Sequence, residues 1–456
     1  MYFGRTLPFQ LNLLDLTIKK MKSQLKHIIY LLLFVACTNP TKKPEQSIKK
    51  NNTHIIHSLN ANEIKKGNKT IVISGATLID GSGGDLIQNS LVIIKNDIID
   101  FVGDVGEAEI PEGADFFDAK GMTLLPGLID AHFHGATADM PTTFLKKGVT
   151  SVRDPGAWNE TYDVARQSGK AVPRLFLTGP HIDKYPPAYP KNSYLIQDPM
   201  EGRIAVNKFA DRGATAIKVY FRLSTAMIAA ICDAAHKKGI PVTAHLEITN
   251  AIDAINVGLD GIEHITSFGT ALSSPREEEK YKNKIMGDNS ARDRGRYEVW
   301  NTLDIDDNPL VDPLVQLLVE HETFVSPTLA VFERQADKGD SIEVSGFANM
   351  LKFTGKVKKG GGRVVVGSHT WVPYAETGNA YYREMELLKD AGLSNMDVII
   401  AATLENARFF SVDERLGSIE KGKIADLILL RENPLEDLKA MGTIEKVMLN
   451  GVFIEL

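Results

Sequence analysis

The stretch that decides the fold is Leu124-Leu-Pro-Gly-Leu-Ile-Asp-Ala-His-Phe-His134, an apolar run that ends in two histidines. Short runs this rich in apolar residues are typical of a buried strand. His132 and His134 stand two positions apart, so on a strand their side chains leave on the same face. The stretch therefore predicts a buried strand that carries a pair of imidazoles at its carboxyl end.

Strand-like runs of this kind recur along the middle of the chain and alternate with amphipathic, helix-like stretches. Parallel strands need a crossover helix between them, so this alternation predicts parallel pairing. Eight units over residues 126–414 match the size of a (β/α)8 TIM barrel of the α/β class. The eight predicted strands are Leu128–His134, Thr150–Arg153, Arg174–Thr178, Ala216–Tyr220, Pro241–His245, Gly261–Ile265, Phe324–Thr328 and Arg363–Gly367.

Both ends of this middle region carry short β-rich runs separated by glycine, aspartate and asparagine turns. They fall in residues 69–125 and 415–456, and we expect them to form one small β-sandwich domain together. A charged insert, residues 273–307, separates the sixth and seventh barrel strands. We expect the insert to be a solvated helical segment over the mouth of the barrel.

The composition excludes some classes of function. The chain has 456 residues, of which 43% are hydrophobic and 24% charged, and a formal net charge of −6. This balance is ordinary for a soluble protein and gives no reason to expect nucleic acid as a partner. The two cysteines, Cys37 and Cys232, cannot form a disulfide framework. Cys232 falls in a helical run and is predicted to be buried and inert.

The segment before Cys37 indicates export. From Met21, which resembles the true start after an upstream stretch 1–20, a short basic run leads into about ten apolar residues. That is too short to cross a bilayer, which needs about 20 residues, but typical of a secretory signal. A small residue directly before Cys37 resembles the lipobox of bacterial lipoproteins; an ordinary cleaved signal or a buried strand is the alternative. We expect 1–36 to hold the upstream segment and signal peptide, 37–68 a flexible tether, and Cys37 a lipid anchoring the exported protein in the cell envelope.

Five histidines fall at or just after the carboxyl ends of predicted strands, where barrels place their working groups. Imidazole is the commonest metal ligand, and several that converge indicate a metal site better than any one alone. Lys218 lies in the apolar fourth strand, where an unpaired ammonium would be costly. The five histidines are His132, His134, His245, His264 and His369.

The chain resembles the amidohydrolase superfamily from about Thr70 to Leu456, and most specifically in the stretch that ends at His134. Other motifs resemble the imidazolonepropionase-like and metal-dependent dipeptidase-like branch of that superfamily. They are Gly148–Asp154, Ala216–Tyr220, Gly261–His264, Ala401–Ala407 and Gly417–Asp426. The resemblance implies a (β/α)8 barrel with a β-sandwich built from the chain ends.

The resemblance also implies two divalent metal ions, with zinc as the default for nitrogen and oxygen ligands. It places His132 and His134 at the buried metal, and His245 and His264 at the outer one. Lys218 would bridge the two metals as a CO2-derived carbamate. Carboxylation would also turn a lone buried cation into an anionic ligand.

One position departs from the family pattern. Where the family usually has an aspartate after the eighth strand, this chain has His369, expected to be a ligand or the general base because imidazole titrates near a pKa of about 6.5. Tyr220 is expected to assist at the substrate carbonyl, or to be a core aromatic residue. His181, in the loop after the third strand, is expected to contact substrate or to pack that loop. Asp154 and Glu263 are expected to orient neighbouring histidines.

The resemblance implies hydrolysis of C–N amide bonds by a metal-activated hydroxide, with dipeptides, N-acyl amino acids or cyclic amides as substrates. A mononuclear deaminase or imidazolone-type ring opener is one alternative, against which Lys218 argues because one metal needs no bridging carbamate. A barrel lipoprotein that has lost turnover and acts in binding is another, supported by His369. Expected partners are a small amide or dipeptide, the membrane through the lipid anchor only, and a second copy as a possible homo-oligomer.

Overall fold

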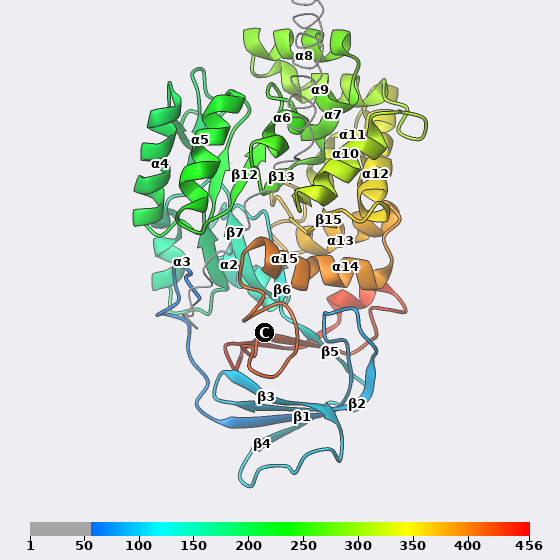
Figure 1. Ribbon diagram of the computed structural model, residues 1–456. Helices are drawn as coiled ribbons and strands as arrows, with labels where there is room; N and C mark the ends of the chain where they lie inside the picture. Colours follow the sequence, from blue (N-terminus) through cyan, green and yellow to red (C-terminus); the bar gives the residue numbers. More distant parts are fainter. Residues whose placement is uncertain (1–55) are drawn as a thin grey trace, which may run out of the picture. The chain divides into compact units, whose positions relative to one another are not determined.

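The computed structural model describes residues 56–456 (Figure 1). The predicted signal segment, Cys37 and most of the predicted tether lie outside the described residues. Within residues 56–456, no helix combines the length and the apolar character needed to cross a membrane.

Parallel strands form the barrel, and all eight predicted strands are present. One sheet holds the first three, and a second sheet in the order β10-β9-β11-β12-β13-β14-β15 holds the rest. Two backbone hydrogen bonds of 2.9 Å close the ring, from Ala131 N to Val366 O and from Thr215 N to Leu177 O. The strands are β6 (Leu128–Asp130), β7 (Val149–Asp154), β8 (Arg174–Leu177), β9 (His181–Asp183), β10 (Ser193–Leu195), β11 (Ile217–Val219), β12 (Val242–His245), β13 (Gly261–Glu263), β14 (Phe324–Ser326) and β15 (Arg363–Val364).

Helices follow the barrel strands in the alternation that the sequence predicts, and local signals start several of them. The Asp198 side chain accepts from two backbone N–H groups of α4, and capping boxes begin α12 at Asp340 and α14 at Ser394. The helices are α2 (Met140–Lys146), α3 (Asp163–Gln167), α4 (Pro199–Asp211), α5 (Thr225–His236), α6 (Ala251–Asn256), α7 (Gly269–Leu272), α10 (Val311–Glu320), α11 (Leu329–Ala336), α12 (Ser341–Lys359), α13 (Ala380–Asp390), α14 (Asn395–Ala402) and α15 (Leu404–Phe409). Cys232 is buried in α5, as predicted.

Strands from both chain ends join in one eight-stranded sheet, in the order β18-β17-β16-β5-β1-β2-β3 with β4 paired to β1. Antiparallel pairing of β5 with β16 connects the two ends. The sheet lies at the opposite end of the barrel from α8 and α9 (Figure 1). Its folding into a two-layered sandwich, and the exact domain boundaries, stay predictions. The strands are β1 (Thr70–Leu78), β2 (Ile87–Lys95), β3 (Ile98–Asp104), β4 (Asp115–Asp118), β5 (Thr123–Pro126), β16 (Leu427–Leu430), β17 (Ile444–Leu449) and β18 (Val452–Phe453).

A buried ion pair fastens this sheet to the barrel. Arg174 on β8 donates from Nε and Nη2 to the Asp426 carboxylate at 2.9 and 3.1 Å, and from Nη2 to Asn450 Oδ1 at 3.0 Å. Both charged side chains are 4% exposed, so the pair is shielded from water and salt. The bidentate geometry fixes the two parts in one register.

The segment just before the sheet packs against the barrel. Asn60, fully buried, donates from Nδ2 to Pro173 O at 2.8 Å and accepts from Leu175 N at 3.0 Å. Asn60 therefore ties this part of the predicted tether to the barrel beside strand β8, while the boundary of the tether at residue 68 stays a prediction.

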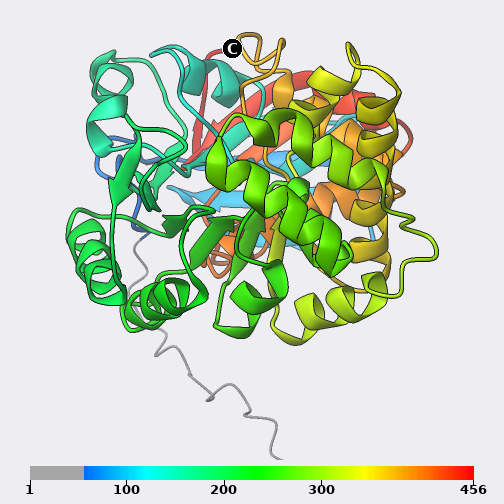
Figure 2. The same cartoon turned by 90° about the horizontal axis from the view of Figure 1, so that it is seen from above.

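The insert forms two helices, α8 (Pro275–Gly287) and α9 (Ala291–Asn301). Seen from above, they cross the middle of the barrel mouth (Figure 2). The predicted helical excursion is present, but its description as solvated is wrong in part. Tyr281, Arg292, Tyr297 and Trp300 are all less than a tenth exposed, because one face of the two helices packs onto the barrel.

Candidate metal centre

The five histidines from the strand ends meet at the carboxyl end of the barrel. The Nε2 atoms of His132 and His134 lie 3.2 Å apart. Ligand-capable nitrogens of His132, His264 and His369 all lie within 4.8 Å of one another. The His245 ring lies 4.5 Å from that of His264, centroid to centroid. The histidines therefore form one continuous cluster.

Four of these histidines are each held through one ring nitrogen, which leaves the other available to a metal. This is the arrangement that fixes ring orientation in metal sites. The holding contacts are His132 Nδ1 with Glu263 Oε2, His134 Nδ1 with Asp154 Oδ1 at 3.2 Å, His264 Nδ1 with Thr328 Oγ1 at 2.7 Å, and His245 Nε2 with Glu247 Oε1 at 2.9 Å. On His245 the other nitrogen, Nδ1, is buried without a hydrogen-bond partner among the described residues.

Lys218 on β11 is buried beside this cluster. Its nearest acidic group is Glu263, whose Oε1 lies 3.5 Å from Nζ, and Nζ has no hydrogen-bond partner among residues 56–456. Burial lowers the pKa of Lys218 to about 8, although Glu263 acts in the opposite direction. A lysine of this kind is partly neutral near physiological pH, which is the form that adds CO2.

Glu263 lies between Lys218 and His132. It contacts the His132 ring through Oε2, and its Oε1 accepts from Thr243 Oγ1 at 2.9 Å. Burial alone would raise the pKa of Glu263, but Lys218 and His132 together bring it well below the usual range. The carboxylate therefore stays ionised and holds the His132 ring in place.

The backbone around the histidines is strained and closely packed. His264, Thr328, His369 and Thr370 all have left-handed backbone, with φ between 43° and 65°. Strained positions of this kind cluster at functional sites. A Cβ at Gly367 would lie 2.8 Å from the Cβ of His132, so only glycine allows the loop that carries His369 to approach β6.

A buried carboxylate fastens that loop. Asp130 accepts from Ser368 Oγ at 2.5 Å and from the backbone N–H groups of Ser368 and His132 at 2.9 and 3.0 Å. Burial raises the pKa of Asp130 to about 6. Sequence reasoning did not single out this residue, although it lies two positions before His132.

His369 joins the cluster as a neutral imidazole. Its ring stacks on His132 with centroids 4.9 Å apart and 15° between the planes, and its backbone N–H donates to His132 O at 2.7 Å. Burial lowers the pKa of His369 well below 6.5, and His132 and His134 lower it further. The ordinary imidazole pKa assumed from the sequence is therefore wrong in this setting, because the ring is desolvated and surrounded by other imidazoles.

Tyr220 and His181 lie together on one side of the cluster. Their rings stack with centroids 4.6 Å apart, and Tyr220 lies 4.6 Å from the His245 ring. His181 is on strand β9 rather than in a loop, because the third barrel strand resumes after the break at Gly179 and Pro180. The roles assigned to both residues stay predictions.

Three further residues belong to the site and were missed by sequence reasoning. Glu247 bonds His245, accepts from Tyr281 Oη at 2.5 Å, and pairs with Arg296 Nη2 at 2.9 Å. Tyr281 is on α8 and Arg296 on α9, so the insert helps to hold a histidine of the centre. The only signal in the sequence was the position of Glu247 two residues after His245.

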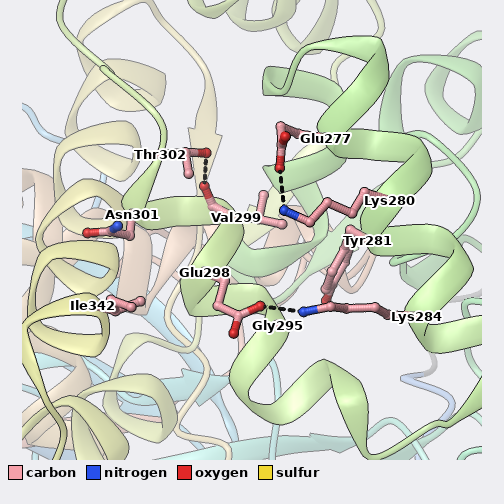
Figure 3. Close-up of a pocket in the computed structure, with 10 residues that line it drawn as sticks. All are labelled: Glu277, Lys280, Tyr281, Lys284, Gly295, Glu298, Val299, Asn301, Thr302 and Ile342. Atoms are coloured by element: carbon pink, nitrogen blue, oxygen red, sulfur yellow. Dashed lines mark hydrogen bonds and ion pairs between the residues drawn. The ribbon is translucent and has the colours of Figure 1, made fainter.

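A separate pocket of about 360 Å³ opens between α8 and α9 (Figure 3). Its charged residues pair with one another, Glu277 with Lys280 at 3.4 Å and Lys284 with Glu298 at 2.7 Å. The pocket is outside the histidine cluster, and Tyr281 is the one residue common to its wall and to the Glu247 network. Because these charges neutralise one another, the pocket gives no reason to expect a charged ligand.

Sequence comparison finds relatives of several kinds over short segments. The chain is 44% identical to imidazolonepropionase of Idiomarina loihiensis over 62 residues, which are 14% of this chain and 15% of that protein. It is 36% identical to N-acyl-D-aspartate deacylase of Alcaligenes xylosoxydans xylosoxydans over 114 residues, 24% of this chain and 22% of that protein. The matches thus span less than a quarter of these relatives' own length.

Comparison with solved structures finds similar proteins over 85% of this chain, far more than the sequence matches cover. A Xaa-Pro dipeptidase with bound methionine has a TM-score of 0.64 at 22% identity, with 85% of this chain and 100% of that chain covered. An A. niger ochratoxinase has a TM-score of 0.64 at 20% identity, covering 85% and 96%. At these identities the likeness shows the barrel fold alone. The profile described as the amidohydrolase family matches residues 123–454, and with the histidine-lined barrel mouth this places the chain in the amidohydrolase family.

Proposed function

We propose that this protein is a metal-dependent hydrolase that cleaves C–N amide bonds. The observation that carries the proposal is the ligand set itself. Each of four histidines is oriented by a partner at one ring nitrogen, and the buried Lys218 lies beside them with no hydrogen bond among the described residues. A barrel that had lost metal binding would have no need of four such pairs.

The donor set fits two divalent cations, for which zinc is the default. His132 and His134 would hold one ion, His245 and His264 the other, and Lys218 as its carbamate would bridge them. Bound cations would supply a water of lowered pKa and polarise the substrate carbonyl. This part of the proposal explains why the Lys218 amine is kept buried and partly neutral.

His369 is the proton carrier in this proposal. It is neutral at physiological pH, and its Nδ1 is buried without a hydrogen-bond partner among the described residues. A neutral imidazole can accept the proton released by the attacking water and return it to the leaving amine. Its contact with His132 keeps the ring at the cluster throughout.

Tyr220 and His181 would contact the substrate beside the outer metal. The Tyr220 ring lies 4.6 Å from the His181 ring and 4.6 Å from the His245 ring, centroid to centroid, which puts it beside that end of the cluster. Burial raises the pKa of Tyr220 well above its usual value, so the group stays a hydrogen-bond donor.

A single-metal enzyme is the second candidate, because His132, His264 and His369 alone could hold one ion. This arrangement would suit a deaminase or a ring-opening hydrolase. It leaves Lys218 without a role. A screen of the metal-loaded protein covers dipeptides, N-acyl amino acids, cyclic amides and aminopurines. Cleavage of dipeptides or N-acyl amino acids would support the main proposal, and turnover of cyclic amides or aminopurines alone would support the second. The absence of amide cleavage on every substrate would overturn the main proposal.

We also propose that the protein is exported to the cell envelope and anchored there by lipid on Cys37. The support is the sequence before that residue, a basic start and a short apolar run that ends in a small residue. Fatty-acid labelling of the expressed protein should be lost in Cys37→Ser. Equal labelling of both forms would contradict the anchor.

A further inference from the structure

A buried arginine of the insert remains without an adequate partner. Arg292 on α9 is 8% exposed, and its Nη1 has no hydrogen-bond partner among the described residues. The nearest carboxylate, on Asp293, lies 3.7 Å from Nε and is itself 68% exposed. The rings of Tyr189 and Phe221 stabilise this guanidinium in part, and a bound anion would stabilise it further.

The neighbouring cations already have polar partners. Arg296, one helical turn further along α9 and therefore on the same face, pairs with Glu247 at 2.9 Å. Arg222 donates from Nη2 to Ile285 O at 2.8 Å and to Asn289 Oδ1 at 2.5 Å. Arg296 Nε is also buried without a hydrogen-bond partner among the described residues, but its Nη2 pairs with a carboxylate, so Arg292 has more capacity than Arg296 to bind an anion.

Arg292 lies on the side of the cluster where Tyr220 is expected to contact the substrate. Its guanidinium lies 5.0 Å from the centre of the Tyr189 ring and 5.4 Å from that of Phe221. The Phe221 ring lies 5.9 Å from the ring of His245, and Tyr189 lies 5.9 Å from Tyr220. One aromatic side chain therefore separates the guanidinium from a residue of the metal centre.

We propose that Arg292 binds the carboxylate of the substrate, so that the substrates are N-acyl amino acids or dipeptides with a free carboxylate beside the scissile amide. This inference rests on the proposed amide hydrolysis and narrows it. In such substrates only the amide nitrogen and the α-carbon separate the carboxylate from the scissile carbonyl. Neutral cyclic amides would leave the arginine without its anion and are therefore poor substrates.

Binding of the products tests the inference without turnover. Amino acids carry the carboxylate that an N-acyl amino acid or dipeptide leaves behind, and their carboxamides lack the charge. With zinc-loaded protein, calorimetry on a panel of L- and D-amino acids should find at least one that binds, while its carboxamide binds about 10- to 100-fold more weakly. Equal binding of acid and amide, or no binding by any amino acid, would overturn the inference.

Variants identify the residue. Arg292→Met keeps the apolar stem and should weaken binding of that amino acid by about 10- to 100-fold, with a partial return in Arg292→Lys. Arg276→Met on α8, an exposed arginine of the same insert, is the matched control and should bind as the wild type does. Unchanged binding in a folded Arg292→Met would contradict the assignment.

The outcomes also separate this inference from the broader proposal. Cleavage of neutral amides only, with no dependence on Arg292, would leave the hydrolase proposal standing and end this one. Amino-acid binding that depends on Arg292 with no hydrolysis of any amide would end the hydrolase proposal and leave Arg292 as a carboxylate-binding residue without a substrate role. A fall of kcat/KM in Arg292→Met for the acid substrate, with no fall for its carboxamide, would support both.

Discussion

The Nε2 atom of His245 lies 2.9 Å from Oε1 of Glu247, two residues further along the chain. This contact turns the other ring nitrogen of His245 away from Glu247 and leaves it without a protein partner in the described part of the chain. Glu247 is held in turn by Tyr281 and Arg296 of the insert. The helices over the barrel mouth therefore help to set the orientation of a proposed metal ligand.

The ionised Glu247 carboxylate should make the folding stability of the protein depend on pH. Burial alone would raise its pKa, but Arg296, His245 and Tyr281 bring the pKa well below its usual value. A lowered folded-state pKa contributes stability above the unfolded value of about 4.3, and that stability is lost as the pH falls through the folded value. In metal-free protein, Glu247→Gln should melt at a lower temperature than the wild type at pH 7.

The difference between Glu247→Gln and the wild type should shrink as the pH is lowered from about 5 to about 3, because the unfolded wild-type chain takes up a proton at Glu247 in this range while the folded carboxyl, with its pKa of about 2, stays ionised. Circular dichroism melts across this range measure it. Glu279→Gln, at an exposed position of α8, is the control and should follow the wild type. A gap that stays constant with pH would show that the charge of Glu247 does not contribute.

Lys218→Ala should abolish metal bridging and amide hydrolysis while the barrel still folds. The change removes the buried amine beside the cluster that could become a carbamate, and with it a buried cation. Metal analysis, an activity assay and a circular dichroism spectrum of one preparation measure the metal content, the hydrolysis and the folding of the variant. Retained hydrolysis would contradict the bridged mechanism, and Lys389→Ala at an exposed position of α13 should change none of the three.

His369→Asn should lower kcat far more than metal content. Loss of a general base costs about 100-fold or more in rate, whereas the four oriented histidines and Lys218 would still hold the ions. Stopped assays paired with elemental analysis give both values. If metal content falls as much as the rate, His369 is a ligand and not the proton carrier.

The attachment of the β-sheet to the barrel should be strong and independent of the metal centre. Arg174→Met leaves Asp426 buried without its partner, which should lower the free energy of unfolding by about 3–5 kcal/mol. Arg431→Met is the matched control, because its pair with Glu445 leaves the arginine 64% exposed and should cost less than about 1 kcal/mol. Urea unfolding measures both, and equal costs would contradict the importance of the buried pair.

Much of the fold could be read from the sequence. Barrel strands are buried on both faces, so many of them contain apolar runs such as Leu175, Phe176 and Leu177 of β8. The exceptions have physical causes. Gly179 and Pro180 favour a turn, so the resumption of the third strand as β9 was not visible. The packing of Asn60 depends on contacts with strand β8, more than 100 residues away in sequence.

Sequence alone predicts a site residue only where a side chain that can bind a metal stands at the end of a predicted strand. His245 was recognisable because it is a ligand type at a strand end. Arg292 and Arg296 were not, because a charged helix is usually solvated and its buried face is decided by how it docks. Glu247 was not, because its partners Tyr281 and Arg296 come from that docked insert. The charged residues of the insert predict an exposed segment, whereas one of them, Arg296, pairs with Glu247 at the barrel mouth.

The first measurement is the metal content per chain, by elemental analysis of a soluble form that begins at Thr38 and is purified without chelator. The binuclear centre proposed for this barrel predicts about two divalent ions per chain, lost together in Lys218→Ala. A value near one would support the single-metal alternative. A value near zero, after metal and bicarbonate have been supplied, would contradict the hydrolase and leave a barrel kept for binding.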